Sequence, residues 1–414
     1  MNVRRPSPYL IVFTLWLLVF SSASQTMIIS PILPQIGAEL GIADAALGTL
    51  VSAYTLMVGI FALLAGPVSD KIGRRRILLI GTGTMTVALI LHGFVQNYAS
   101  FVGVRLFAGC AGGMLSGAAV SYIGDYFPYH RRGWATGWVM SGSAVGQIVG
   151  IPVGIVLSGR WGFRAPFYMF AVTMAATVAL LFFRVPQPPV KRTEGRLSVR
   201  KAIRDYAGML RRHEVRWAAA AYFVMFLGIS LYLVYLPTWL ERARGIGPDR
   251  IATMYLLGGV ANVVTGPQAG HLSDRVGRRV MVLLACIGLS VVMVATPFVV
   301  REVWVAYPLF FVFMMLVAMR TSPFSALLTA LVHDERRGSL MSLTVALGQI
   351  GFAVGGAVAG ILFAGPGYVS NAVLGAVFLL AMGLIVWFLL PEPAAGDAAD
   401  ALTDAGPAPE TSPR

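Results

Sequence analysis

Charged residues are scarce in this sequence of 414 residues. Only 12% are Asp, Glu, Lys or Arg, against roughly 25% in a soluble globular protein. Apolar residues make up 57% of the chain, and its mean hydropathy is +0.75. This composition excludes a set of soluble domains, a disordered chain, a coiled coil and a collagen. We expect a polytopic membrane protein.

Cysteine, histidine and catalytic motifs are also scarce. Cys110 and Cys286 both lie in apolar runs, so no disulfide is expected and both act as small hydrophobic residues. Five scattered histidines give no metal-binding spacing, and we expect no metal or other cofactor. The sequence has neither a P-loop nor a G-x-S-x-G motif, which argues against direct use of ATP and against an enzyme.

Positive charge is in excess, with a formal net charge of +14. In a membrane chain, basic loops facing anionic lipid explain this excess better than nucleic acid, which would need a soluble basic domain. With the N-terminus inside, cytoplasmic segments hold 24 of the 32 Lys and Arg, six lie outside, and two lie within spans. This bias predicts that both termini are cytoplasmic.

Apolar stretches long enough to cross a bilayer recur twelve times. They lie near 9–30, 46–65, 77–96, 99–124, 134–158 and 163–184, and again near 216–238, 250–269, 280–299, 303–331, 338–363 and 369–390. The first stretch could instead be a removed signal peptide, but its length favours a membrane helix. The predicted organisation is a six-helix bundle in 1–184, a cytoplasmic linker in 185–214, a second bundle in 215–391, and a disordered cytoplasmic tail in 392–414.

The linker contains a predicted amphipathic helix. Four apolar or aromatic residues recur at helical spacing after a potential N-cap at Ser198, namely Val199, Ile203, Tyr206 and Leu210. Arginines occupy the other side, so we expect this helix to lie on the lipid surface.

An internal repeat divides the chain into two halves. The segment 66–75 recurs at 270–279 with an offset of 204, 131–133 recurs at 336–338, and 146–148 recurs at 348–350. Each copy falls at the same place in the order of spans. Two homologous six-helix halves explain this agreement.

The repeated segment follows the pattern G-x-x-x-D-[RK]-x-G-[RK]-[RK], and through it the chain resembles the major facilitator superfamily of secondary transporters over residues 9–391. The resemblance implies an all-α fold of twelve transmembrane helices in two pseudo-symmetric bundles, working by alternating access around a midplane site. Within the family the chain is most similar to bacterial drug:proton antiporters, partly through Leu33–Leu40. That likeness implies a location in the bacterial inner membrane.

The repeated motif is expected to control a cytoplasmic gate. Its glycines permit close helix contact and a turn with positive φ, and its carboxylate faces a helix N-terminus. Arg74 is expected to pair with Asp125, whereas Ala330 occupies the matching position in the second half, whose cluster should be structural. A plain basic loop is the alternative. The motif residues are Gly66, Asp70, Lys71, Gly73, Arg74, Arg75 and Asp125 in the first half, and Gly270, Asp274, Arg275, Gly277 and Arg278 in the second.

Two further features resemble those of proton-coupled relatives. Arg105 in the fourth span matches an arginine thought to tune proton transfer, although it could instead extend to the outer interface. The fifth span carries a ridge of small residues and a kinking proline: Gly142, Gly146, Gly150, Pro152 and Gly154. The ridge resembles the antiporter signature G-x-x-x-G-P-x-x-G-G but places its proline one residue later, and generic close packing is the alternative.

Polar residues within spans are the candidates for substrate binding: Gln25, Gln147, Tyr235, Asn262, Arg320 and Gln349. Each could equally form an interhelical hydrogen bond. No Asp or Glu lies near the midplane, whereas Arg320 lies deep within the tenth span. A buried cation without a buried carboxylate favours a neutral or anionic ligand. The alternative is that the tenth span ends before Arg320.

The predicted function is secondary active transport of a small organic solute, by export coupled to protons. The alternatives are a proton-coupled importer of a sugar or organic acid and a non-transporting membrane sensor. The expected partners are the solute, protons and the lipid bilayer, for a protein that acts as a monomer and binds no nucleic acid.

Overall fold

The structure is a computed structural model that describes residues 7–188, 199–330 and 334–391. Within these ranges the chain forms helices and no strands. Helices suit a bilayer because every backbone polar group is satisfied within the segment. The elements are α1 (Pro8–Met27), α2 (Ile29–Leu40), α3 (Asp44–Ile72), α4 (Arg74–Leu91), η1 (His92–Phe94), α5 (Tyr98–Leu115), α6 (Ala118–Tyr126), α7 (Tyr129–Val145), η2 (Gly146–Gly150), α8 (Ile151–Trp161), α9 (Ala165–Arg184), α10 (Val199–Leu210), α11 (His213–Leu233), α12 (Leu236–Arg244), α13 (Pro248–Val276), α14 (Arg278–Val299), α15 (Val303–Ala330), α16 (Asp334–Ala364) and α17 (Tyr368–Leu389).

These elements form the twelve membrane-spanning helices expected from the sequence. Some spans consist of two or three elements in series, such as α1 with α2, or α7 with η2 and α8. Eleven of the described helical segments are long and apolar enough to cross a membrane. The twelfth span is α13, which is 29 residues long but less apolar because it carries charged residues near both ends and polar residues between them.

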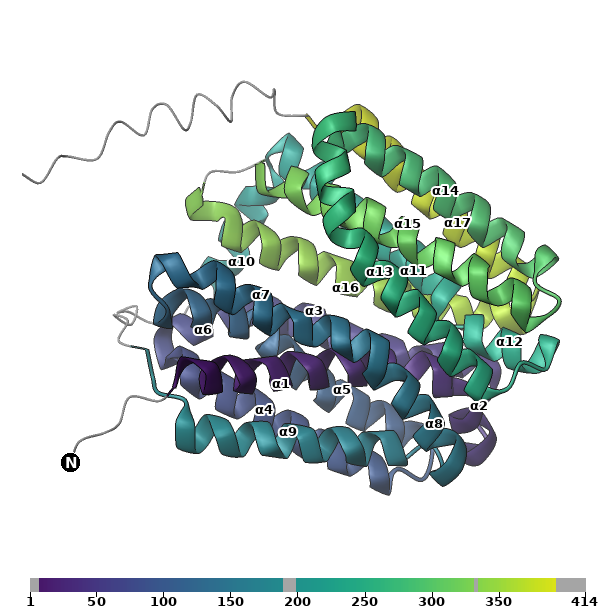
Figure 1. Ribbon diagram of the computed structural model, residues 1–414, viewed down its shortest axis with the longest axis horizontal. Helices are drawn as coiled ribbons and strands as arrows, with labels where there is room; N and C mark the ends of the chain where they lie inside the picture. Colours follow the sequence, from purple (N-terminus) through teal and green to yellow (C-terminus); the bar gives the residue numbers. More distant parts are fainter. Residues whose placement is uncertain (1–6, 189–198, 331–333, 392–414) are drawn as a thin grey trace, which may run out of the picture.

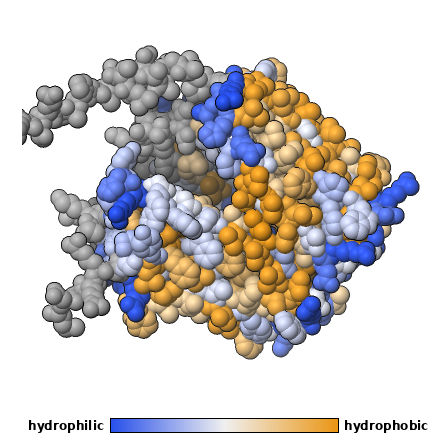
Figure 2. Space-filling model, viewed as in Figure 1, coloured by the Kyte–Doolittle hydropathy of each residue, from blue (hydrophilic) through white to orange (hydrophobic). Residues whose placement is uncertain are grey.

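The spans pack as two bundles, α1–α9 and α11–α17, which lie side by side in Figure 1. We call the end where α1 begins and α17 ends the terminal face, and the end that holds α2, α12 and the starts of α3 and α13 the opposite face. Figure 2 shows an apolar band between two polar ends, the pattern of a protein that spans a bilayer.

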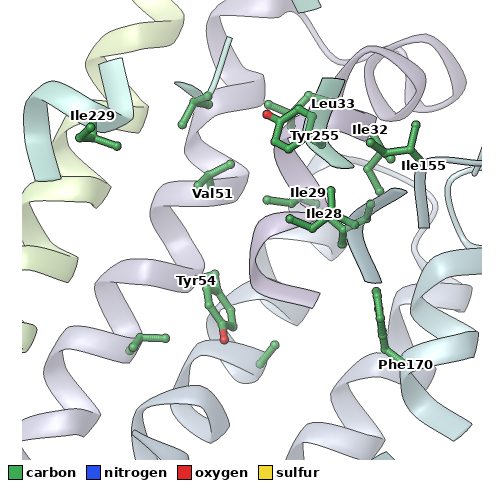
Figure 3. Close-up of a cluster of buried hydrophobic side chains, with 14 of the residues drawn as sticks. Ile28, Ile29, Ile32, Leu33, Val51, Tyr54, Ile155, Phe170, Ile229 and Tyr255 are labelled. Atoms are coloured by element: carbon green, nitrogen blue, oxygen red, sulfur yellow. The ribbon is translucent and has the colours of Figure 1, made fainter. Parts of the chain in front are cut away.

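Several spans are broken where a proline or glycine interrupts the hydrogen-bond ladder. In the fourth span Gly117 has φ +73° between α5 and α6. In the fifth, the π-helical turn η2 stands directly before Pro152 and accommodates the ring that cannot donate a hydrogen bond. At the joint of α1 and α2, Ile28 and Ile29 pack in a buried cluster with residues such as Phe170 (Figure 3).

The glycine ridge of the fifth span packs against α1 in the same half. A Cβ atom added at Gly142 would lie 2.6 Å from the Trp16 carbonyl oxygen, and one added at Gly150 would lie 2.1 Å from Ser24 Oγ. Gly146 and Gly154 are similarly close to α1 and to Ile28. The ridge therefore lets two helices within one bundle approach closely.

The linker helix α10 differs from the expected lipid-surface helix. It begins at Val199, as predicted, but its apolar side packs against protein: Met209 is buried with Val215 and Leu340. Tyr206 Oη donates to the Leu63 carbonyl oxygen at 3.4 Å. The helix thus contacts α3 of the first half and α11 and α16 of the second. Ser198 and the tail 392–414 lie outside the described residues.

Candidate substrate cavity and gates

A cavity of about 540 Å³ lies between the two halves, within the range typical of small-molecule sites. It is lined by α1, α2, α3, η2 and α8 of the first half and by α11, α13, α15 and α16 of the second. Figure 2 shows a recess between the halves on this side of the molecule. Its polar lining residues include Thr26, Ser30, Thr55, Gln147, Tyr222, Tyr255, Asn262, Arg320, Thr321, Ser322, Ser325 and Gln349.

The cavity is sealed toward the opposite face by direct packing of α3 on α16. Ser52 Oγ donates to the Ala353 carbonyl oxygen at 2.5 Å. A Cβ atom added at Gly48 would lie only 2.0 Å from the Gly356 carbonyl oxygen, and one added at Gly360 only 2.3 Å from that of Ala45. These glycines allow the two halves to touch through their backbones.

Tyr235 reinforces this seal and does not line the cavity. Its hydroxyl accepts a hydrogen bond from the Gly48 backbone N–H at 2.7 Å and donates to the Asp44 carbonyl oxygen at 2.5 Å. The Asp44 carboxylate also forms an ion pair with Arg242 across the halves. The expectation that Tyr235 contacts substrate is therefore corrected: its hydroxyl is engaged by backbone groups of the other half.

Neither Asp44 nor Arg242 was predicted from the sequence to form part of a gate. One signal was available, since Asp44 recurs as Asp249 at the repeat offset of 205. The repeat does not indicate, however, that Asp44 faces a basic residue of the other half.

At the terminal face the two bundles diverge (Figure 1). In the fifth span, η2 and α8 make the main contacts with α13, where Gly259 lies against Ile148. The α10 helix crosses this end and touches both halves. The cavity is thus closed by helix packing at one end and bordered by the separated helix ends at the other.

Arg320 supplies the positive charge of the cavity. It is only 3% exposed, and its Nε and Nη1 atoms have no hydrogen-bond partner among the residues that the structure describes. No ion pair joins it to a carboxylate in the described part of the chain, and none of the described lining residues is Asp or Glu. Placed 18th of the 28 residues of α15, Arg320 lies well inside the span.

Four of the six proposed substrate-binding residues line the cavity: Gln147, Asn262, Arg320 and Gln349. Asn262 Nδ2 also donates to the Met314 carbonyl oxygen at 3.5 Å, which is an interhelical contact. Gln25, in contrast, is buried beside the cavity and donates to Tyr54 Oη at 2.7 Å. The hydroxyl residues of α15 that line the cavity were not predicted from the sequence, because such residues are common in packed helix interfaces.

Arg105 is fully buried and does not reach the outer interface. Its Nε donates to the Leu50 carbonyl oxygen at 3.1 Å, and its guanidinium lies 4.3 Å from the centre of the Tyr54 ring. Tyr54 Oη in turn lies 3.0 Å from Thr26 Oγ1, which borders the cavity. Contacts therefore run from the arginine to the Tyr54 ring, and from the Tyr54 hydroxyl to Thr26 at the cavity.

The first copy of the motif places Arg74 in an ion pair with Asp125, as expected. The Nε–Oδ2 distance is 2.5 Å, and Arg74 Nη1 also donates to Ser69 Oγ at 3.0 Å. Gly73 has φ +101°, the positive value expected at the turn. Arg75 instead donates to the Phe182 carbonyl oxygen at 2.6 Å. The side chain of Asp70 lies outside the described residues.

One expectation for this copy is not met. A Cβ atom at Gly66 would meet no atom within 4 Å, so close helix contact does not require glycine there in this conformation.

The second copy is more exposed. Gly277 has φ +102°, matching Gly73. Asp274 Oδ1 pairs with Arg278 Nη2 at 3.1 Å across the turn between α13 and α14, and the Asp274 side chain is 60% exposed. A Cβ atom at Gly270 would lie 3.2 Å from Ser322 Oγ. Arg275 is exposed, as is Asp274, so the described contacts of this copy are weaker than those of the first.

Comparisons with known proteins agree with this architecture. The chain is 27% identical to the multidrug resistance protein MdtG of Enterobacter lignolyticus, over 70% of each chain. It is also 27% identical to the probable sulfoacetate transporter SauU of Cupriavidus necator, over 67% of this chain and 68% of the relative. Its fold superposes on the crystal structure of a D-xylose–proton symporter with a TM-score of 0.77, at 18% identity, over 93% of this chain and 98% of that one.

The family model described as Major Facilitator Superfamily matches residues 15–319 and, in a second match, 218–412. Members are multi-pass membrane transporters that bind small molecules and are not enzymes. The sealed and open ends of the cavity, the repeated loop motif and these matches agree, and the chain belongs to the major facilitator superfamily.

Proposed function

We propose that the protein exports a small organic solute from the cytoplasm in exchange for protons, as a monomer in a bacterial inner membrane. The observation that carries the proposal is the cavity between the halves, which is sealed at the opposite face by Gly48, Gly356 and Tyr235. A site that faces one side at a time is what alternating access requires.

The terminal face is assigned to the cytoplasm by its charge. Lys71, Arg74, Arg132, Arg212 and Arg279 all lie in helix ends or loops at this face, and basic residues concentrate on the cytoplasmic side of membrane proteins. With this orientation the structure is inward-facing, and the cavity is ready to receive solute from the cytoplasm.

Export by antiport is supported by two features. The chain resembles a multidrug resistance protein over 70% of its length. Arg105, Tyr54 and Thr26 connect a buried charge to the cavity, so proton movement near Arg105 can respond to an occupied site. The ion pair of Arg74 with Asp125 is proposed to hold the first bundle together at the cytoplasmic gate.

Everted membrane vesicles test the proposal. Respiration acidifies their interior, and a pH-sensitive dye reports the gradient. A panel of organic acids, alcohols and amines is added outside the vesicles. We expect an exported solute to release protons from the vesicle interior. Vesicles carrying the Asp125→Asn protein are the control. Movement of the solute and of protons in the same direction across the membrane would contradict antiport.

Import of an organic acid is the second candidate. It is favoured by the 27% identity to a probable sulfoacetate transporter. Import predicts that an inward proton gradient drives uptake of the acid into right-side-out vesicles. It also predicts no uptake into everted vesicles whose interior is acidic.

A further inference from the structure

We infer that the cavity is built for an organic anion with an apolar body, whose carboxylate or sulfonate group binds Arg320. This inference rests on the proposed function only in taking the cavity as the transport site. It adds the chemical class of the substrate.

The charge of the cavity is unbalanced. Arg320 is 3% exposed and has two buried guanidinium nitrogens, Nε and Nη1, for which the described residues provide no acceptor. A buried cation is costly unless a negative group and hydrogen-bond acceptors accompany it. Because no described lining residue is acidic, the missing acceptors must come from elsewhere. A bound anion supplies both the charge and the acceptor atoms.

The geometry of the guanidinium favours a planar or multi-oxygen acid. Nε and Nη1 each form an edge of the guanidinium together with Nη2, and either edge can donate in parallel to two oxygens of a carboxylate or sulfonate. Hydroxyl groups of Ser322 and Ser325 line the same part of α15 and can donate to the remaining oxygens. An amine or quaternary ammonium would instead be repelled by Arg320.

The rest of the cavity is apolar and aromatic. Phe226 and Phe352 form one pair of rings, with their centroids 6.3 Å apart, and Met225, Ile229 and Val317 add aliphatic surface. A small inorganic anion would leave this surface in contact with water. An organic acid that carries a ring or an alkyl chain buries it and gains hydrophobic free energy.

The test uses ligands that share one body and differ in charge. Binding to the purified full-length protein is measured by calorimetry with 2-naphthoate, naphthalene-2-sulfonate, 2-naphthalenemethanol and 2-naphthylmethylammonium. We expect the two anions to bind at least about tenfold more tightly than the neutral and cationic probes, as charged hydrogen bonds of ordinary strength provide.

Three variants assign the preference to one residue. Arg320→Met removes the charge with an apolar side chain of similar length and should abolish the preference for anions. Arg320→Lys keeps the charge but loses the paired donors, and should retain the order of affinities with weaker anion binding. Arg250→Met makes the same change at an exposed arginine of the opposite face and should leave binding unchanged.

Anionic lipid is the other source of the same chemistry. Each titration is therefore repeated with phosphatidylglycerol added to zwitterionic lipid. Competition by this lipid would assign Arg320 to a lipid head group and overturn the proposal. Tighter binding of the neutral or cationic probe, no binding of either anion at millimolar concentration, or an anion preference that survives Arg320→Met would also overturn it.

Equilibrium binding separates this inference from the proposed function. A protein that binds anions through Arg320 but does not export them would refute export alone. Proton-coupled export of an amine through the same cavity would refute the anion site and leave export intact.

Discussion

With the terminal face on the cytoplasmic side, as proposed above, Gly48→Ala should shift the transporter from the inward-facing toward the outward-facing state. In the structure, a Cβ atom at this position would lie 2.0 Å from the Gly356 carbonyl oxygen and 3.0 Å from the Tyr235 ring. Ordinary contacts of this kind exceed 3.4 Å, so α3 and α16 must separate. Overpacking of this kind costs about 1–3 kcal/mol, and in a two-state equilibrium that corresponds to a shift of about 5- to 150-fold.

The shift can be read from the accessibility of the cavity. A cysteine is introduced at Asn262, which lines the cavity, in a background from which Cys110 and Cys286 have been replaced. Intact cells are then treated with a membrane-impermeant maleimide. Because the seal at the opposite face is weakened, Gly48→Ala should accelerate labelling from outside several-fold or more.

Two matched substitutions serve as controls. At Gly83 a Cβ atom meets no atom within 4 Å, so Gly83→Ala should change neither labelling nor stability. At Gly109 the Cβ atom would lie 2.4 Å from the Tyr54 carbonyl oxygen within the same half, so Gly109→Ala should lower stability without faster external labelling. Unchanged labelling of a folded, membrane-inserted Gly48→Ala protein would refute the assignment of this contact as the external seal.

Three further predictions follow from named contacts. Arg320→Met should raise the apparent melting temperature in scanning fluorimetry at a fixed heating rate, because each unsatisfied buried donor costs about 1–3 kcal/mol of folding free energy. A lower melting temperature would show that Arg320 stabilises the fold. Tyr235→Phe should accelerate external maleimide labelling more than Asp44→Asn, because it removes two hydrogen bonds of a buried hydroxyl. The Asp44 ion pair is partly exposed, and such pairs contribute about 0–1 kcal/mol. Faster labelling of the Asp44→Asn protein would refute this ranking. Asp125→Asn should abolish most efflux without loss of protein from the membrane, and Asp274→Asn should cost less because its ion pair is exposed; equal losses in the vesicle assay would contradict the asymmetry.

The local features of the site could be predicted from the sequence. The pairing of Arg74 with Asp125 was available because the loop motif and the end of the fourth span both adjoin the same bundle end. The positive φ at Gly73 and Gly277 was available because a tight turn between two helices requires it. The depth of Arg320 was indicated by its distance from the end of an apolar run.

Contacts between the two halves could not be predicted in this way. Tyr235 was expected in the cavity, but it binds the backbone at Gly48, 187 residues away. The apolar side of α10 was expected in lipid, but it packs under both halves through Tyr206 and Met209. An amphipathic pattern states that one side of a helix is buried without stating whether lipid or protein covers it.

The sequence by itself determined that the chain spans a membrane twelve times in two related halves, because apolar run length and internal repetition are properties of the chain alone. Only the tertiary structure decided which end of the cavity is sealed, that Arg320 faces it with no acidic partner among the described residues, and that Gly48 and Gly356 touch. The physical reason is that alternating access lets one sequence place its two halves in more than one arrangement of similar free energy. Contacts between the halves therefore depend on the arrangement and not on local sequence preferences.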